Sequence, residues 1–265
     1  YSSSAPALCS HSGCLLLAWT ESSNERLSVM YSTDNGATFE GKVTSPEISN
    51  VGPALASHNR LNIKTPPQHN LRIAWPGAAS VIIDTEGGPG TNIPNVLNVA
   101  RIPLSANTSG TFGGIEHLAN KNVLTDTSST ALALASLGGR LFLAWRSLDN
   151  DELNIMFSSD DGATFEGKTV LASALEGSDV GPALASHNGN LFMAWKASQT
   201  GNLNVAQVLF SIDSSGTFQG IEGLIGQTTL AETSSAAPAL CSHNGRLFLA
   251  WKGPGNATDL YVMLS

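Results

Sequence analysis

Every tryptophan of this chain lies in the same short phrase, in which an apolar residue is followed by Ala-Trp. The five copies end at Trp19, Trp75, Trp145, Trp195 and Trp251, and they recur roughly every fifty residues. In each copy the apolar side chains alternate in the way typical of a strand with one buried face. Five units of this length favour a β-propeller, in which each unit forms one blade.

The strands inside a unit can be read from the fourth and third copies. Residues 182–187 form a first apolar run, and residues 190–195 form the second strand. Asn188-Gly189 lies between them and favours a tight hairpin, because both positions tolerate a positive φ. Residues 153–157 and 164–171 of the third copy supply the third and fourth strands. We therefore predict an all-β propeller with five detectable blades of four antiparallel strands.

The repeats also set the expected boundaries. One domain covers residues 1–265, with blades at approximately 1–48, 49–126, 127–176, 177–232 and 233–265. The last copy stops in its third strand, so the last blade is incomplete in this chain and we expect the chain to continue. The second copy is longer than the others because of an insertion before Trp75 and a Gly- and Pro-rich stretch, residues 76–95, after it.

The turn between the third and fourth strands carries the motif S-x-D-x-G-x-T-F. Its members are Ser32, Asp34, Gly36, Thr38 and Phe39 in the first copy and Ser158, Asp160, Gly162, Thr164 and Phe165 in the third copy. Residues 211–218 and 105–112 are weaker versions of it. A short carboxylate can accept hydrogen bonds from nearby backbone N–H groups. We therefore expect these aspartates to be structural residues that hold a turn.

This motif resembles the Asp-box, or BNR, repeat of sialidases and related β-propeller proteins. The resemblance implies a propeller whose boxes lie on the face opposite the ligand site, and it makes an exo-sialidase-like glycoside hydrolase one alternative. Such an enzyme needs an arginine cluster, a Tyr–Glu pair and an acid/base Asp. Arg101-Ile102-Pro103 resembles one arginine phrase of the family but lies on a third strand, and Tyr31 occupies a packing position. We predict no catalytic residues.

A repeat that keeps the same residues in several blades can create several equivalent sugar sites, as in propeller lectins. Candidates at the ends of the second strands and the starts of the third strands are Trp19, Trp145, Trp195, Trp251, Arg146, Lys196, Lys252, Asn98, Asn154 and Asn204. An indole face suits the C–H face of a pyranose, and an asparagine amide suits hydroxyl groups. In the alternative interpretation the tryptophans are wedges between blades and the asparagines stabilise the linkers.

Non-catalytic glycan binding is therefore the preferred function, with glycans or glycoproteins as partners. A scaffold or protein-interaction propeller without a sugar site is the second alternative, because a fold by itself decides no function. Trp145, Trp195 and Trp251 are followed by Arg146, Lys196 and Lys252. We expect these three cations to border similar shallow sites.

Composition excludes several other classes. The formal charge of −8 argues against nucleic acid, which calls for a basic surface, and no apolar run is long enough for a transmembrane helix. The three cysteines show no C-x-x-C spacing, which argues against zinc. One histidine per blade, at His11, His58, His187 and His243, would be too widely spread for one metal. We expect no metal or cofactor and, from the sequons at Asn107 and Asn256, a secreted or extracellular protein.

Overall fold

The computed structural model describes residues 1–2, 4–59, 69–78, 81–83, 91–93, 95–106, 112–172 and 177–265. Throughout this part the regular secondary structure is β-strand, and no helix in it is long and apolar enough to cross a membrane. The chain divides into two compact units. Unit 1 is Tyr1–Ala131 with Asp160–Thr164, and unit 2 is Leu132–Ser159 with Phe165–Ser265.

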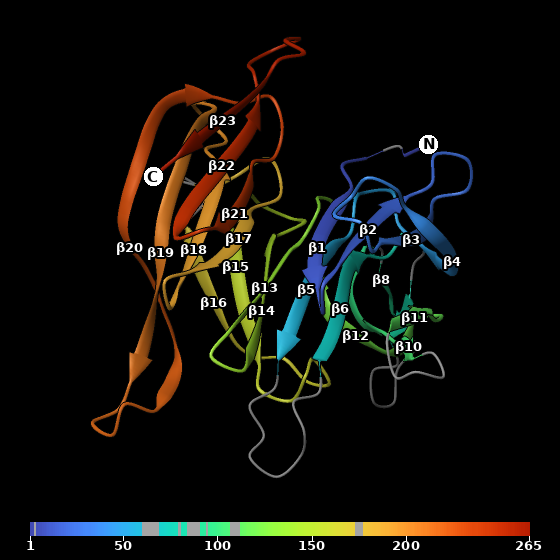
Figure 1. Cartoon of the computed structure of the whole chain (residues 1–265). Helices are drawn as coiled ribbons and strands as arrows, with labels where there is room; N and C mark the ends of the chain where they lie inside the picture. The colour runs from blue at the N-terminus through green and yellow to red at the C-terminus, as the bar shows by residue number, and fades with distance from the viewer. Residues whose placement is uncertain are drawn as a thin grey trace. The chain divides into compact units, whose positions relative to one another are not determined.

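Unit 1 holds two four-stranded antiparallel sheets (Figure 1). The first sheet follows chain order and consists of β1 (Ala7–His11), β2 (Cys14–Thr20), β3 (Arg26–Ser32) and β4 (Glu40–Ile48). The second sheet has the order β12 (Ala119–Thr127), β9 (Val96–Ile102), β6 (His69–Pro76) and β5 (Ala54–Asn59). Two small hairpins lie between its strands in the chain: β7 (Val81–Ile83) with β8 (Thr91–Ile93), and β10 (Leu104–Ala106) with β11 (Phe112–Ile115).

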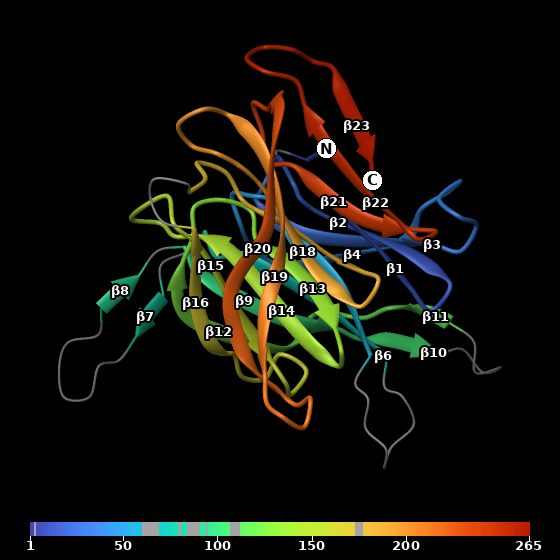
Figure 2. The same ribbon diagram turned by 90° about the vertical axis from the view of Figure 1, so that its left-hand side faces the viewer.

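Unit 2 holds three sheets, all in chain order. The first is formed by β13 (Ala133–Leu137), β14 (Arg140–Arg146), β15 (Leu153–Ser158) and β16 (Glu166–Ala172). The second is formed by β17 (Ala183–His187), β18 (Asn190–Lys196), β19 (Asn202–Ile212) and β20 (Phe218–Thr233). The third has β21 (Ala239–His243), β22 (Arg246–Lys252) and β23 (Leu260–Leu264). Strands β19 and β20 extend beyond their neighbours in both views (Figures 1 and 2).

These five antiparallel sheets are five blades, and the prediction of an all-β propeller fold with an incomplete last blade is confirmed. The second blade differs in detail from the expectation. Hairpin β10–β11 stands between its third and fourth strands, where the weakest copy of the turn motif was expected. Asn107 of that copy and its sequon lie outside the described residues, as do Asp84 and Glu86 of the Gly- and Pro-rich stretch.

The tight hairpins form as the turn residues predict. His187 of β17 pairs with Asn190 of β18, which leaves Asn188 and Gly189 as the two turn residues. Their φ angles are +48° and +77°, the left-handed values that Asn and Gly tolerate best. The hairpin of β21 and β22 uses Asn244-Gly245 in the same way.

A buried serine fastens the linker before a blade to the end of that blade's second strand. Ser234 Oγ donates to the carbonyl oxygens of Ala236 (2.7 Å) and Lys252 (2.9 Å). Ser49 makes the equivalent bonds to Val51 (3.0 Å) and Pro76 (2.8 Å). In every copy a serine stands four positions ahead of the first-strand proline or, in the third blade, ahead of Leu132. This repeated serine was not singled out from the sequence.

The cores lie between neighbouring sheets within each unit. In unit 2, Phe142, Leu191 and Trp195 belong to one cluster built from the first two sheets. In unit 1, Leu16, Ile73 and Trp75 belong to the corresponding cluster. Each second strand supplies buried apolar residues, because it lies between two strands of its own sheet and faces a neighbouring sheet.

Candidate functional site

The aspartate side chains of the turn motif accept hydrogen bonds from residues of their own turns. Asp34 accepts bonds from the backbone N–H (2.9 Å) and the hydroxyl (2.7 Å) of Thr38. Asp160 accepts the same pair from Thr164, at 2.8 and 2.7 Å. The residue after each aspartate and the following glycine have positive φ. These bonds, led by the Thr38 backbone N–H, lower the pKa of Asp34 to about 2, so the carboxylate stays ionised and acts within the turn.

The tryptophans lie in the cores instead of on a surface. Trp145 and Trp195 are 1% and 0% exposed and Trp251 is 5% exposed. This burial leaves little of the three rings exposed for stacking on sugars, and it agrees with the wedge interpretation. Trp19 is partly buried, and the ammonium group of Lys42 lies 5.6 Å from its ring centroid.

The repeated asparagines face inward. Asn154 donates to the carbonyl oxygen of Glu152 (3.1 Å), and Asn98 donates to that of Val96 (2.9 Å). Asn204 repeats this bond to Asn202 and also accepts from the Thr229 hydroxyl at 2.6 Å. All three are buried. Their amides hold the backbone where the third strand begins, which agrees with the alternative interpretation that they stabilise the chain locally.

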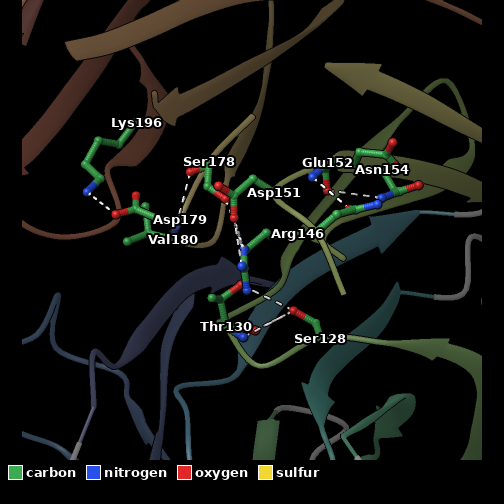
Figure 3. Close-up of polar contacts among 11 residues, drawn as sticks. Ser128, Thr130, Arg146, Asp151, Glu152, Asn154, Ser178, Asp179, Val180 and Lys196 are labelled. Atoms are coloured by element: carbon green, nitrogen blue, oxygen red, sulfur yellow. Dashed lines mark hydrogen bonds and ion pairs between the residues drawn. The ribbon is translucent and has the colours of Figure 1, made fainter. Parts of the chain in front are cut away.

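Two of the three predicted cations, Arg146 and Lys196, differ from the tryptophans and asparagines, because they form ion pairs in one polar cluster of unit 2 (Figure 3). Arg146, at the end of β14, donates to Asp151 Oδ1 from Nε (3.2 Å) and Nη2 (2.8 Å). Its Nε also lies 3.1 Å from the carbonyl oxygen of Ser178. Lys196, at the end of β18, donates to Asp179 Oδ2 at 2.7 Å. We call Arg146, Asp151, Ser178, Asp179 and Lys196 the rim cluster.

The local chain path brings the members of the rim cluster together. Asp151 lies in the loop after β14, and Ser178 and Asp179 lie in the linker before β17. The Ser178 N–H donates to the Asp151 carbonyl oxygen at 2.9 Å. A Cβ at Gly177 would collide with that oxygen, so a glycine is needed where the linker crosses the loop.

The charges of the rim cluster are unevenly exposed. The side chains of Arg146 and Lys196 are 17% and 11% exposed, whereas those of Asp151 and Asp179 are 34% and 46% exposed. Each carboxylate binds its cation through one oxygen. Its second oxygen makes no hydrogen bond with another described residue. Two fixed, solvent-facing acceptor groups on adjacent blades are the result.

The fifth blade does not repeat this arrangement. Lys252 follows Trp251 as predicted, but Ser235 stands where the fourth blade has Asp179, and its hydroxyl donates to the Gly253 carbonyl oxygen. Within the described residues Lys252 makes no ion pair. The prediction of three similar sites at Arg146, Lys196 and Lys252 is therefore replaced by one cluster that contains the first two.

Among the described residues, Tyr31 and Arg101, which were considered for sialidase chemistry, take part in packing and strand pairing. Tyr31 packs edge-on against Phe112, with ring centroids 4.7 Å apart. Arg101 pairs with Arg72 across β9 and β6, near the β5–β6 hairpin end of the second blade. The repeated histidines bind neighbouring strands: His11 Nδ1 lies 2.8 Å from Ser57 Oγ and His187 Nδ1 lies 2.9 Å from Ser242 Oγ. In the described chain no three potential metal ligands are grouped.

The sequence reasoning missed both carboxylates of the rim cluster. It followed residues that recur in several blades, whereas Asp151 and Asp179 each occur in one blade only. Their signal was the departure from the repeat: an acidic residue directly after the linker serine Ser178, and another in the loop after Arg146.

Comparison with known proteins supports the fold and goes no further. The sequence matches no protein-family model, and no curated protein sequence matches it significantly. Among solved structures, the Penicillium chrysogenum α-L-arabinanase complexed with arabinobiose is 14% identical with a TM-score of 0.57. The match covers 97% of this chain and 76% of the arabinanase.

Two further structures are similar at lower scores. The Trypanosoma rangeli sialidase in complex with the inhibitor DANA is 13% identical, with a TM-score of 0.48 over 98% of this chain and 54% of the sialidase. A Bombyx mori GH32 β-fructofuranosidase is 12% identical, with a TM-score of 0.46 over 92% of this chain and 53% of the enzyme. The chain thus spans about half the length of these two proteins. At such identities the arabinanase match defines the class of the fold, a β-propeller.

Proposed function

We propose that this chain is a non-catalytic carbohydrate-binding propeller of the lectin type, and that the rim cluster is its sugar site. One observation carries the proposal: two carboxylates on adjacent blades, Asp179 exposed and Asp151 partly exposed, are each fixed by a largely buried cation. A carboxylate oxygen accepts hydrogen bonds from hydroxyl groups, and a charged acceptor makes stronger bonds than a neutral one. Sugar hydroxyls are therefore suitable partners for Asp151 and Asp179.

The physical cost of binding also favours this site. Arg146 and Lys196 already hold the carboxylates in place, so little side-chain freedom is lost when a ligand arrives. The tryptophans contribute no stacking face, and we therefore expect weak affinity for a free sugar, raised on a surface that carries many copies of it. The arabinanase complexed with arabinobiose shows that a protein of this fold can hold a sugar.

The test is glycan-array binding of the parent protein and of Asp179→Asn, together with hydrolysis of fluorogenic glycosides, a sialoside among them. Asp179→Asn removes the charge and the partner of Lys196, and we expect binding to fall at least about tenfold, which corresponds to 1.4 kcal/mol. Asp149→Asn is the matched control, because Asp149 is exposed on the β14–β15 loop but belongs to no ion pair of the rim cluster.

The outcomes of these two assays distinguish a lectin, a hydrolase and a scaffold. Array binding that Asp179→Asn loses and Asp149→Asn keeps, without turnover, supports the lectin assignment. Turnover of a glycoside by the parent protein would make the chain a hydrolase. Absence of both binding and turnover would favour a scaffold.

A further inference from the structure

The second blade departs from the repeat at three positions that touch one another. The first and third blades place apolar or aromatic pairs in the middle of their sheets, Leu16 opposite Tyr31 and Phe142 opposite Phe157. The second blade has Arg72 opposite Arg101 at the equivalent place. Cross-strand partners lie on the same face of a sheet, so two guanidinium groups are neighbours there.

The fourth strand of this blade has changed accordingly. In the first and third blades the aromatic ring lies on a glycine of the fourth strand, and a Cβ at Gly41 or Gly167 would collide with Tyr31 or Phe157. The second blade has Asn120 at this position, still with a positive φ of 51°. A side chain fits there because the aromatic ring is absent.

Together these changes open a polar cavity of about 290 Å³ in unit 1. It is lined by Asn70, Arg72, Arg101, Asn120, Asp160 and Asp161. Arg72 is 6% exposed, and its Nε has no hydrogen-bond partner among the described residues. An arginine keeps its charge in proteins, and a buried charge without a bonded partner is costly.

Both carboxylates that line the cavity have close contacts with other residues. Both oxygens of Asp160 accept bonds from Thr164, and Asp161 Oδ1 lies 3.0 Å from His58 Nε2. Burial is the main cause that lowers the pKa of Arg72, and the charge of Arg101 adds to it, while the charges of Asp161 and Asp160 oppose this effect. Like charges placed directly opposite each other destabilise a sheet. The Nε–H of Arg72 therefore remains a donor without an acceptor among the described residues, although two carboxylates line the cavity.

We infer that this cavity is a binding site for a small carboxylate, held by Arg72 and Arg101 and assisted by the amide groups of Asn70 and Asn120. The planar fork of a guanidinium group matches a carboxylate with two parallel hydrogen bonds. The volume suits a molecule of few heavy atoms, since cavities for drug-sized ligands are larger. This site lies in unit 1 and does not depend on the sugar site proposed for unit 2.

The experiment uses acetate as the probe, added to the whole protein at constant pH and constant ionic strength. We expect acetate to raise the melting temperature and to shift the NMR signals of the Arg72 and Arg101 side chains. In the variant Arg72→Leu/Arg101→Tyr/Asn120→Gly the second blade carries the residues of the first. We expect this variant to fold at least as stably as the parent without acetate and to lose the acetate effect.

Two single variants complete the test. Arg101→Lys keeps the charge but loses the fork, and we expect acetate to bind about tenfold more weakly, a change of 1.4 kcal/mol. Arg26→Lys alters an exposed arginine of the same unit and should leave binding unchanged. The inference is overturned if the parent protein does not respond to acetate, if the triple variant responds equally, or if sulfate replaces acetate with a larger effect.

Discussion

At the scale of single residues, Asp34 shows how one carboxylate organises a turn. Its two oxygens accept three bonds, from the Thr38 N–H, the Thr38 hydroxyl and the Ser32 hydroxyl. The Ser32 oxygen in turn accepts a bond from the Gly36 N–H at 2.8 Å. A helix cap is a comparable device, in which a short polar side chain satisfies backbone donors that the chain itself leaves unpaired.

These bonds predict a specific pH dependence. The pKa of Asp34 is lowered from 3.8 to about 2 by the Thr38 N–H, the Thr38 hydroxyl and the Ser32 hydroxyl. Because the pKa in the folded state is below the unfolded value, the stabilisation is present above about pH 4 and is lost as the pH falls through about 2. We expect an NMR titration to place the Asp34 carboxyl near pH 2.

A control for this titration is needed because Glu21 also has a pKa lowered to about 2, through its bond from Lys42. The turn is therefore followed at the Thr38 amide in the parent protein and in Asp34→Asn. The Thr38 signal should move near pH 2 in the parent and stay constant in the variant. An Asp34 pKa close to 4 would contradict the proposed geometry of the turn.

At the scale of elements, the linker serines join one blade to the preceding chain. Ser234 is 5% exposed, and its hydroxyl donates to two carbonyl oxygens. We expect Ser234→Ala to lower the free energy of unfolding of unit 2 by about 1 to 3 kcal/mol, because two partly buried carbonyl oxygens lose their donor. Urea unfolding measures this change. Ser214→Ala, on an exposed turn of the same unit, is the control, and an equal loss in both variants would contradict the role of Ser234.

Most of the elements could be predicted from the sequence, because the repeat states each of them several times. The Ala-Trp phrase fixed the second strands, and Asn188-Gly189 located a hairpin whose φ angles have the expected sign. The sites could not be predicted in the same way. Asp179 in the rim cluster and Arg72 in the cavity each occur in one blade, so the pattern that locates strands carries no information about them.

The repeat pattern was also the reason why the tryptophans and asparagines were predicted to contact sugars. A residue that recurs in every blade satisfies a demand that every blade shares, and packing or backbone hydrogen bonding is such a demand. Trp195, whose phrase recurs in all five blades, is buried in this way, and Asn204, whose position carries asparagine in three blades, is buried as well. Arg101, by contrast, occurs in one blade only and lines the polar cavity.

At the scale of the whole molecule, unit 1 includes a short segment that lies between two strands of unit 2 in the sequence. Residues Asp160–Thr164 connect β15 and β16 of unit 2, yet they belong to unit 1. There Asn122 donates to the carbonyl oxygens of Gly162 and Ala163, at 3.4 and 3.0 Å. His58, which is fully buried, faces Asp161. The stability of unit 1 therefore depends on residues that follow it in the sequence.

This dependence predicts the effect of Asp161→Asn. Asparagine tolerates the positive φ of 64° at this position, so the substitution removes the charge and spares the turn. We expect the free energy of opening of unit 1 to fall by about 1 to 3 kcal/mol, since a buried histidine and a buried arginine lose the carboxylate beside them. Hydrogen exchange checks this directly: the amides of β5 and β6 should exchange faster, while those of β21 and β22, in unit 2, should be unchanged. If β5 and β6 exchange as slowly as in the parent protein, the turn contributes nothing to unit 1.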